Sequence, residues 1–343
     1  MFSIRYTIGI LISLAFLIAL ISQIHIEEMI TSFKNANYAY LIPGIIIYFV
    51  SLYFRSIRWK YLLAPFEQIK TKRLYPVLLV GYLANNVLPL RAGELIRSYY
   101  LAKRENISTA TGLATILVER VFDGITLITF ILFGGFFLPI FPLFSDFSTT
   151  LNLPNNSLLY LVIGAFLLVL VLIVLVGIIP NLFIQGTVNL IKILPKKLRL
   201  TAIPLIERFY SGFIGMNKPS RLFNVFFLSL PVWIAEACMY FIIGYGFGID
   251  SFFSSLWEYC LVILVVVSAS NLATAIPSSQ GSVGPFEVFA TMALIYLGVS
   301  NGIASAYVII LHLSLLFPVI IVGIGYMFYA SLSLKQLTGE ASE

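Results

Sequence analysis

The sequence predicts an all-α, polytopic integral membrane protein with six to eight transmembrane helices. Of its 343 residues, 60% are hydrophobic and 10% are charged, and the mean hydropathy is +0.99. A soluble globular protein cannot bury that much apolar surface. Apolar runs of about 20 residues recur along the chain, and no alternating pattern of about ten residues indicates a β-barrel. We therefore expect one integral membrane domain over residues 1–343.

Six apolar segments are long enough to be full transmembrane helices. The first is too long for a signal peptide and no small-residue cleavage site follows it, so we expect it to be retained. Two more segments, 74–102 and 256–299, are interrupted by polar residues and are candidates for re-entrant or broken helices, although the second could also form two complete spans. The six full spans are expected near 6–24, 38–54, 111–139, 157–179, 222–248 and 302–330.

The positions of Lys and Arg predict the orientation of the chain. Residues 55–73 carry six of them and residues 181–221 carry seven, whereas the loops that alternate with these contain only Lys34. Because such residues concentrate in cytoplasmic loops, we expect a protein of the cytoplasmic membrane. Both termini would be cytoplasmic if 74–102 re-enters from the inner side and 256–299 from the outer side. The net charge of +6 has the same origin, so no nucleic-acid partner is expected.

The long basic segment 181–221 is expected to lie along the inner surface of the membrane. Its apolar and basic residues alternate at near-helical spacing, with breaks at Pro195 and Pro204. Such a helix can bury its apolar face at the membrane surface and place its basic residues near anionic headgroups. A solvated connector is the alternative.

Several ionisable residues fall inside apolar segments, where each costs several kcal/mol if it faces lipid. Glu119 and Asp123 are four residues apart on one helix face, and Arg120 lies beside them. This cluster fits either a functional site or an internal salt bridge that joins two helices. Glu236 and His312 are expected to make structural polar contacts between helices. The full set is Arg91, Glu94, Arg97, Glu119, Arg120, Asp123, Glu236, Glu287 and His312.

The two interrupted segments share a spacing that indicates an internal repeat with an offset near 190 residues. In each, a Pro precedes a Gly by four residues, and a Glu precedes a second ionisable residue by 25. The predicted topology gives the two copies opposite orientations, as in inverted-repeat transporters with broken helices near the midplane. The matching positions are Pro89 and Gly93, Pro277 and Gly281, Glu94 and Glu119, and Glu287 and His312.

The breaks also predict a binding site for an anionic group. A half-helix that begins near Gly93 or Gly284 directs unpaired N–H groups and a positive dipole end toward the break. Arg91 and Arg97 add positive charge, and a guanidinium can bind two phosphate oxygens at once. The sequence therefore favours an anionic lipid headgroup as ligand.

No catalytic, metal or cofactor motif is found, so we expect neither an enzyme nor a bound cofactor. There is no P-loop and no Gly-rich nucleotide fingerprint, and the chain contains only two His residues. Cys238 and Cys260 lie in apolar segments without ligand-like spacing, and we expect both to be buried packing residues.

Three motifs, NNVLPLRAGELIRSYYL, ATILVERVFDGITL and AIPSSQGSVGPFE, together resemble the membrane region of the bacterial lysylphosphatidylglycerol synthase/flippase family. In that family the membrane region is regarded as a lipid flippase, and a separate C-terminal soluble domain transfers the aminoacyl group. Since this chain ends at Glu343 after its last span, the resemblance implies a stand-alone, flippase-like member without the transferase domain.

The resemblance also identifies motif positions. The second break departs from the family, which more often has a tighter glycine cluster before Phe-Glu, and this puts its local geometry in question. The positions carried over are Asn85, Asn86, Pro89, Arg91, Gly93, Glu94, Arg97, Glu119, Arg120, Asp123, Pro277, Gly281, Gly284, Phe286 and Glu287.

The main functional hypothesis is a flippase for an anionic phospholipid or a lipid-linked intermediate. The arginines and asparagines of the motifs, with His312, would contact the headgroup, while the carboxylates would balance charge or relay protons. Three alternatives stay open. They are a membrane transferase with Glu27, Glu28 or the buried cluster as its base, a non-catalytic partner of a separate synthase or glycosyltransferase, and a cation- or proton-coupled exporter of a small solute. The lipid, the direction of movement and the oligomeric state are not predicted.

Overall fold

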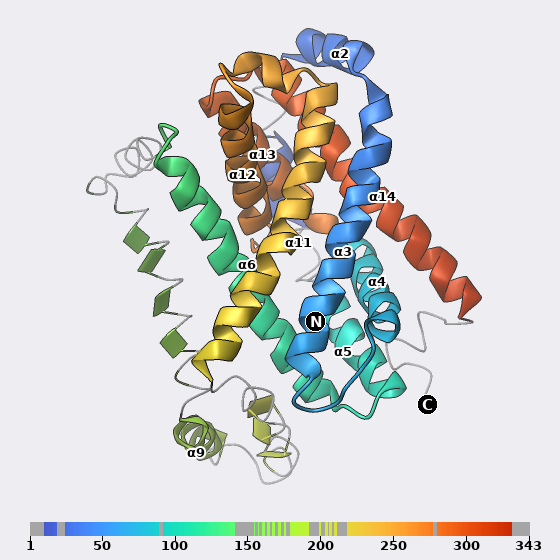
Figure 1. The fold of residues 1–343 in the computed structure, drawn as a ribbon, viewed down its shortest axis with the longest axis vertical. Helices are drawn as coiled ribbons and strands as arrows, with labels where there is room; N and C mark the ends of the chain where they lie inside the picture. Colours follow the sequence, from blue (N-terminus) through green and yellow to red (C-terminus); the bar gives the residue numbers. More distant parts are fainter. Residues whose placement is uncertain are drawn as a thin grey trace.

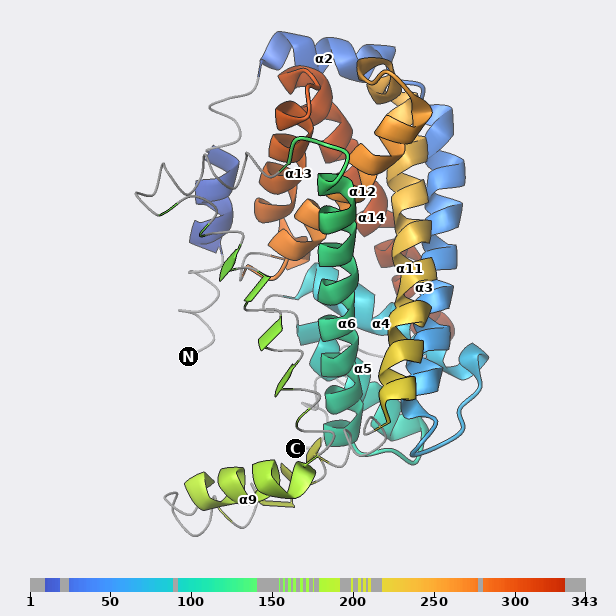
Figure 2. The ribbon, with the colours of Figure 1, turned by 60° about the vertical axis from the view of Figure 1, so that its left-hand side comes forward.

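In the part of the chain that the structure describes, four long helices and two shorter helical hairpins form a bundle (Figures 1 and 2). The computed structural model describes residues 10–18, 25–88, 92–140, 179–191, 218–276 and 280–330, and scattered positions between 154 and 210. Within these residues every regular element is helical. The long helices are α3 (Leu41–Leu63), α6 (Thr109–Gly135), α11 (Pro219–Gly246) and α14 (Asn301–Tyr329). The predicted all-α membrane fold is confirmed.

Each hairpin consists of two shorter helices, and two further helices lie across the ends of the bundle. α2 (Ile26–Asn35) crosses one end, and α9 (Pro180–Ile191) lies crosswise at the other, in the segment expected at the membrane surface (Figure 2). The first hairpin contains α4 (Thr71–Val87) and α5 (Ala92–Arg104), and the second contains α12 (Leu256–Ala273), the 3-10 turn η3 (Gln280–Ser282) and α13 (Pro285–Tyr296).

Four described helices are long and apolar enough to cross a membrane: 38–63, 220–246, 256–273 and 301–329. α6 is also long enough, since its 27 residues extend about 40 Å at 1.5 Å per residue. Its hydropathy is lowered by three charged residues in adjacent turns. The spans predicted near 111–139, 222–248 and 302–330 therefore agree with the structure, whereas most of 157–179 lies outside the described residues.

The span predicted at 38–54 ends too early. α3 continues to Leu63, and both Arg55 and Arg58 lie inside it with 4% and 0% of their surfaces exposed. Counting them among the basic residues of a cytoplasmic loop was therefore wrong. They are buried because carboxylates on neighbouring helices neutralise them, which the distribution of basic residues along the sequence does not reveal.

Both interrupted segments are helix breaks, as predicted. α5 begins at Ala92, and α13 begins at Pro285 with Gly284 as its N-cap. With 12 residues, α13 is about 18 Å long, short of the roughly 30 Å hydrocarbon core, which does not favour two complete spans in the second segment. Pro89, Arg91 and Pro277 lie outside the described residues.

The two hairpins enter the protein from opposite ends. The ends of the first hairpin meet where Arg73 forms an ion pair of 2.8 Å with Glu105, close to the start of α6. The second hairpin begins at the other end of α6, where the ring of Trp257 lies 6.3 Å from that of Phe133. Figures 1 and 2 accordingly show α4 and α5 in one half of the bundle and α12 and α13 in the other.

The helix contacts confirm the inverted repeat. α4 packs on α14 and α5 on α6, while α12 packs on α6 and α13 on α14. The most extensive contact between two helices is that of α3 with α11. α6 and α14 begin at Thr109 and Asn301, 192 residues apart, close to the predicted offset. The second hairpin contacts the first, because η3 packs against α4.

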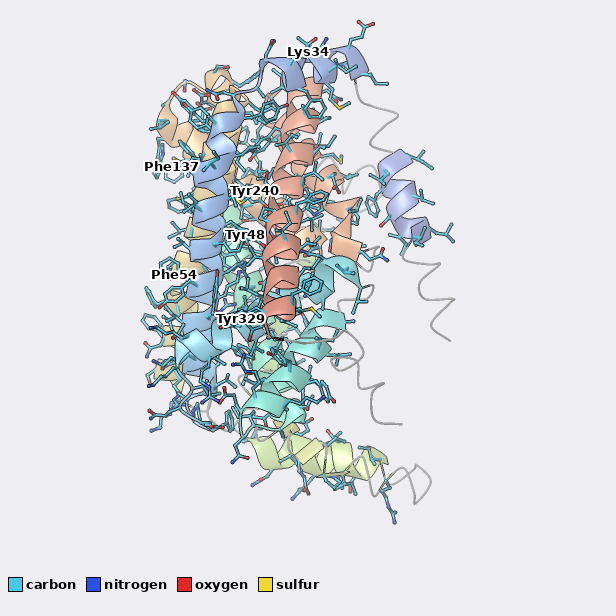
Figure 3. The ribbon with its side chains drawn as sticks, turned by 90° about the vertical axis from the view of Figure 1, so that its right-hand side faces the viewer. Lys34, Tyr48, Phe54, Phe137, Tyr240 and Tyr329 are labelled. Atoms are coloured by element: carbon cyan, nitrogen blue, oxygen red, sulfur yellow. The ribbon has the colours of Figure 1, made fainter. Side chains whose placement is uncertain are left out.

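Aromatic and aliphatic side chains fill the space between the long helices. Figure 3 shows Tyr48 and Tyr240 in the interior, and the Tyr307 hydroxyl donates a hydrogen bond of 2.9 Å to the Tyr240 carbonyl. The expectation that both cysteines are buried was wrong for Cys238, which is exposed, and Cys260 is half-buried. An apolar stretch of a membrane protein can face lipid, so apolar neighbours in the sequence do not imply burial.

Candidate functional site

Four arginines and four carboxylates meet in the half of the bundle that contains the first hairpin. We call this group the ion-pair network. Its opposite charges are equal in number, so the network is neutral when every member is ionised. Six side chains are at most 6% exposed, whereas Arg120 and Glu94 are 32% and 28% exposed. The members are Arg55 and Arg58 of α3, Glu94 and Arg97 of α5, Glu119, Arg120 and Asp123 of α6, and Glu236 of α11.

Asp123 is the centre of the network. Its Oδ1 accepts hydrogen bonds from Arg58 Nη1 at 2.7 Å and from the Trp233 indole nitrogen at 2.9 Å. Its Oδ2 lies 3.7 Å from Arg55 Nη1 and 3.5 Å from Arg120 Nη1. One carboxylate thus faces three guanidinium groups from two helices.

Arg55 and Arg58 also join α3 to α11. Arg55 Nη2 donates a hydrogen bond of 2.7 Å to Glu236, and Arg58 Nη1 donates one of 2.8 Å to the Ser229 hydroxyl. The guanidinium of Arg55 also lies 4.6 Å from the ring centre of Trp233. Glu236 therefore makes the interhelix polar contact expected from the sequence.

Arg97 fixes α5 against α6. Its Nη1 donates a hydrogen bond of 2.8 Å to Glu119, and its guanidinium lies 3.6 Å from the ring centre of Trp59, a cation–π contact. Two glycines, Gly81 of α4 and Gly93 of α5, allow these helices to lie in close contact. A Cβ atom on Gly81 would lie 2.8 Å from Arg97 Cβ, and one on Gly93 would overlap the Gly81 carbonyl oxygen.

Arg120 and Glu94 form the exposed end of the network. Arg120 Nε lies 3.5 Å from Glu94 Oε1, and Arg120 Nη1 lies 3.5 Å from Asp123 Oδ2. Both separations exceed the usual 2.7–2.9 Å of a charge-assisted hydrogen bond. Arg120 therefore combines the greatest exposure of the four arginines with the loosest pairing.

The second hairpin contains a separate polar cluster. His312 Nδ1 lies 2.5 Å from Glu287 Oε1, and His312 Nε2 lies 3.0 Å from the Gly281 carbonyl oxygen. The other oxygen of Glu287 accepts the Gly284 N–H at 2.7 Å, so the N-cap of α13 is satisfied internally. The ring of Phe286 stacks on that of His312 at 4.1 Å. The sequence spacing of 25 residues thus corresponds to a direct contact.

The asparagines of the first motif lie at the end of α4. Asn85 and Asn86 are half-buried, and Asn85 Oδ1 has no hydrogen-bond partner among the described residues. Neither has a recorded contact with the network. The sequence analysis missed Arg55, Arg58, Trp59 and Trp233 as members or neighbours of the site. Continued helical periodicity from Ser51 to Leu63 was the only sequence signal for the first three.

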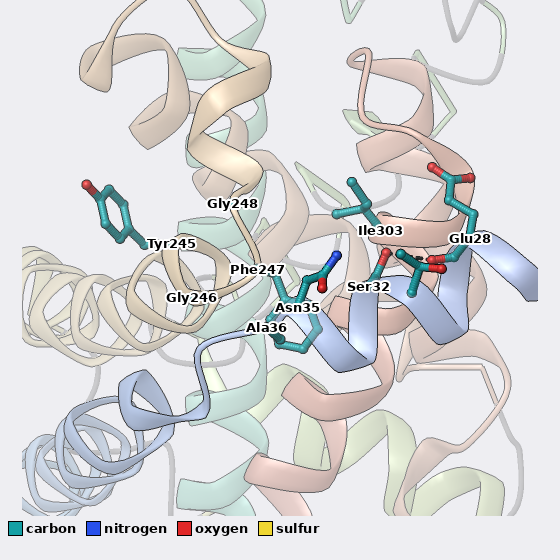
Figure 4. Close-up of a pocket in the computed structure, with 10 residues that line it drawn as sticks. Glu28, Ser32, Asn35, Ala36, Tyr245, Gly246, Phe247, Gly248 and Ile303 are labelled. Atoms are coloured by element: carbon teal, nitrogen blue, oxygen red, sulfur yellow. Dashed lines mark hydrogen bonds between the residues drawn. The ribbon is translucent and has the colours of Figure 1, made fainter.

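A cavity of about 410 Å³ lies at the far end of the bundle, beneath α2 (Figure 4). Glu28, Ser32 and Asn35 line it from α2, and Phe247 and Ile303 line it from the opposite side. Glu28 Oε2 accepts the Gly302 N–H at 3.0 Å and so ties α2 to the start of α14. This cavity contains no member of the ion-pair network.

Residues 6–323 match the sequence profile described as the lysylphosphatidylglycerol synthase TM region. A UPF0104 membrane protein of Methanocaldococcus jannaschii is 31% identical over 138 residues, 39% of this chain and 41% of that protein. Glycosyltransferase AglD of Haloferax volcanii is 24% identical over 375 residues, 98% of this chain and 56% of that protein. A UPF0104 membrane protein of Methanothermobacter thermautotrophicus is 23% identical over 97% of both chains. No solved structure matches.

Proposed function

Because the chain belongs to the lysylphosphatidylglycerol synthase TM region family, we propose that it is a flippase-like transporter of an anionic phospholipid or lipid-linked intermediate. The observation that carries this proposal is the exposed end of the ion-pair network. Arg120 is accessible there, and its partners Glu94 and Asp123 are both 3.5 Å away. This chain spans 41% of the length of the Methanocaldococcus jannaschii relative and 56% of the length of AglD, so the proposal concerns the matched membrane region alone.

An anionic headgroup can replace Glu94 as the partner of Arg120. Phosphate oxygens accept paired hydrogen bonds from one guanidinium, which a carboxylate at 3.5 Å does not achieve. Glu94 is 28% exposed, so it can turn toward water when it is displaced. The buried arginines would hold the positive potential around the site without contacting the lipid directly.

The two hairpins supply a route between the leaflets. Irregular backbone at membrane depth is tolerated only when it is buried in protein or lines a cavity. Here the η3 turn of the second hairpin packs against α4 of the first. In inverted-repeat transporters, movement of one repeat against the other exposes a central site to each side in turn. We extend that mechanism to the network and propose that headgroups enter from the cytoplasmic side.

A flipping assay in proteoliposomes tests the proposal. Fluorescent phosphatidylglycerol and phosphatidylcholine report movement of an anionic and a zwitterionic lipid by their accessibility to an external quencher. Arg120→Ala should slow phosphatidylglycerol movement at least tenfold, and Arg120→Lys should be intermediate because ammonium binds as a point charge.

Arg104→Gln is the matched control. Arg104 is the last residue of α5 in the first hairpin, and its Nη1 donates a hydrogen bond of 2.8 Å to the Tyr326 hydroxyl outside the network. This variant should retain the wild-type rate. Equal rates for wild-type protein and folded Arg120→Ala protein would refute a headgroup role for Arg120, and no protein-dependent movement of either lipid would refute transport of phospholipids.

The relative named a glycosyltransferase supports a second candidate, a transferase or a non-catalytic partner of one that acts on a lipid-linked substrate. Glu27 and Glu28 at the start of α2, or the network, would then contact the substrate. Incubation of the purified chain with a labelled sugar donor and a lipid acceptor tests the first form through product formation. Co-purification of a synthase or glycosyltransferase from native membranes tests the second form.

A further inference from the structure

Both ring nitrogens of His312 face oxygen atoms. Nδ1 lies 2.5 Å from Glu287 Oε1, and Nε2 lies 3.0 Å from the Gly281 carbonyl oxygen. The side chains of His312 and Glu287 are 5% and 10% exposed, so water does not readily replace either partner. These contacts join α14, α13 and the η3 turn at one point.

The chemistry of these oxygens fixes the number of protons. A backbone carbonyl can only accept, so Nε2 must carry a proton. Nδ1 and a carboxylate oxygen at 2.5 Å also need a proton between them, since otherwise two lone pairs would face each other. That proton can sit on Nδ1, as imidazolium and carboxylate, or on Oε1, as neutral imidazole and carboxylic acid. In both cases the pair holds one proton more than neutral imidazole with carboxylate.

We infer that His312 and Glu287 form a proton-binding site whose occupancy holds the tip of the second hairpin against α14. Release gives a neutral imidazole, a carboxylate and one proton transferred to water. The one remaining ring proton can form a hydrogen bond with only one of the two oxygens, that of Glu287 or that of Gly281. Either the Gly281 bond is lost, or the Nδ1 lone pair faces the Glu287 carboxylate. Proton release therefore removes one of the two hydrogen bonds that join His312 of α14 to η3 and α13 at the tip of the second hairpin.

No other charged side chain has a recorded contact with this pair in the described part of the chain. Helix 10–18 packs on Gly284 and contains no titratable residue. α11 contributes Tyr240, whose ring lies 6.4 Å from that of Phe286.

Three titratable groups on the neighbouring helices have partners of their own. Tyr82 of α4 lies against the Arg55 guanidinium, and Glu258 of α12 accepts from Ser254. Glu28 of α2 binds the Gly302 N–H at the start of α14. Ten residues separate Gly302 from His312, or about 15 Å along the helix.

The position of the site connects it to movement of the hairpins. Gly281 has φ +65° and lies in the η3 turn that contacts α4 of the first hairpin. A Cβ on Gly281 would meet Leu316 of α14 at 3.0 Å, so the tip is closely fitted to α14. The proton-binding site therefore lies beside one of the contacts between the second hairpin and the first. This inference goes beyond the proposed lipid transport and does not depend on the identity of the lipid.

Nitrogen NMR of the protein in lipid nanodiscs measures the proton directly. The chain has two His residues, so His25→Gln with ¹⁵N-labelled histidine leaves only the His312 signals. At pH 7 we expect a protonated Nε2 and an Nδ1 whose signal reports a proton shared with Glu287. Raising the pH should change both signals in a single one-proton transition. A bare, non-bonded Nδ1 at pH 7 would overturn the inference.

Two variants in the His25→Gln background separate the site from general effects of charge. Glu287→Gln keeps an oxygen for the Gly284 N–H but removes the carboxylate, so proton affinity should fall at least tenfold. Glu258→Gln removes a carboxylate of the same hairpin that is bound to Ser254, and should leave the transition unchanged. Equal transitions in all three proteins would refute the role of Glu287. The NMR experiment does not measure transport, so a protein that moves no lipid still tests the inference. If Glu287→Gln does not fold, the signals of His312 in the His25→Gln protein test the inference by themselves.

Discussion

Substitution of Arg58 by Met tests whether charge balance holds the ion-pair network together. Arg58 is fully buried, and it contacts Asp123 at 2.7 Å, Ser229 at 2.8 Å and Glu119 at 3.7 Å. Met fills similar space without charge, so Arg58→Met changes the network from neutral to −1. Removal of one partner of a buried ion pair costs about 3–5 kcal/mol. We expect a loss of that size in the free energy of unfolding.

The complementary change, Asp123→Asn, leaves the network at +1 and should cost a similar amount. In the double variant the network is neutral again, and the Asn oxygen can still accept from the Trp233 indole. Replacing both partners of a buried pair is often close to neutral, so we expect the double variant to lose about 2 kcal/mol or less. Reversible unfolding of the detergent-solubilised protein by increasing SDS, followed by circular dichroism, gives the three free energies.

Lys60→Met is the matched control because Lys60 is exposed on the same helix. It should change stability by about 0.5 kcal/mol or less. If the double variant loses the sum of the two single losses to within about 0.5 kcal/mol, the residues are not coupled and charge balance does not explain their burial. A loss below about 1 kcal/mol for Arg58→Met would also refute the argument.

Two further substitutions test the packing around the network. Gly93→Ala should destabilise the protein by about 1–3 kcal/mol or more, because the added Cβ would overlap α4. Gly325→Ala is the control, since the space around its added Cβ is open and no loss of stability is expected. Thermal unfolding measures both variants, and equal midpoints would contradict the close approach of α4 and α5. Thr115→Val should cost about 1–3 kcal/mol by leaving the indole N–H of Trp59 without its 3.1 Å acceptor. Thr129→Val is its control because that hydroxyl is exposed and bonds only within α6; an equal loss in both variants would exclude the indole bond as the cause.

Composition and spacing along the sequence predict much of this fold. Long apolar runs locate α6, α11 and α14 to within a few residues, because crossing a bilayer requires a continuous apolar segment. The repeated spacing of Pro, Gly and Glu locates both hairpins, but the direct contact between Glu287 and His312 was not predicted. The inverted orientation follows from the distribution of Lys and Arg.

The end of α3 could not be found in the same way. Charge along the sequence does not distinguish an arginine in a loop from one that carboxylates neutralise inside the bundle. Arg58 and Asp123 are 65 positions apart, and Trp233 and Asp123 are 110 positions apart. Such pairs arise only when the helices pack. The i, i+4 spacing predicts that Glu119 and Asp123 share a face, but not what lies opposite them.

The neutrality of the ion-pair network has an electrical consequence. If the described network binds one monoanionic lipid without releasing a proton, the occupied site carries one net negative charge. A bacterial-type membrane potential, negative inside, drives such a charge outward by about 2.3 kcal/mol per 100 mV for a complete crossing. The empty, neutral site returns without working against that field. Under the proposed function, a membrane potential therefore favours net outward movement of the lipid while the protein cycles between its loaded and empty forms.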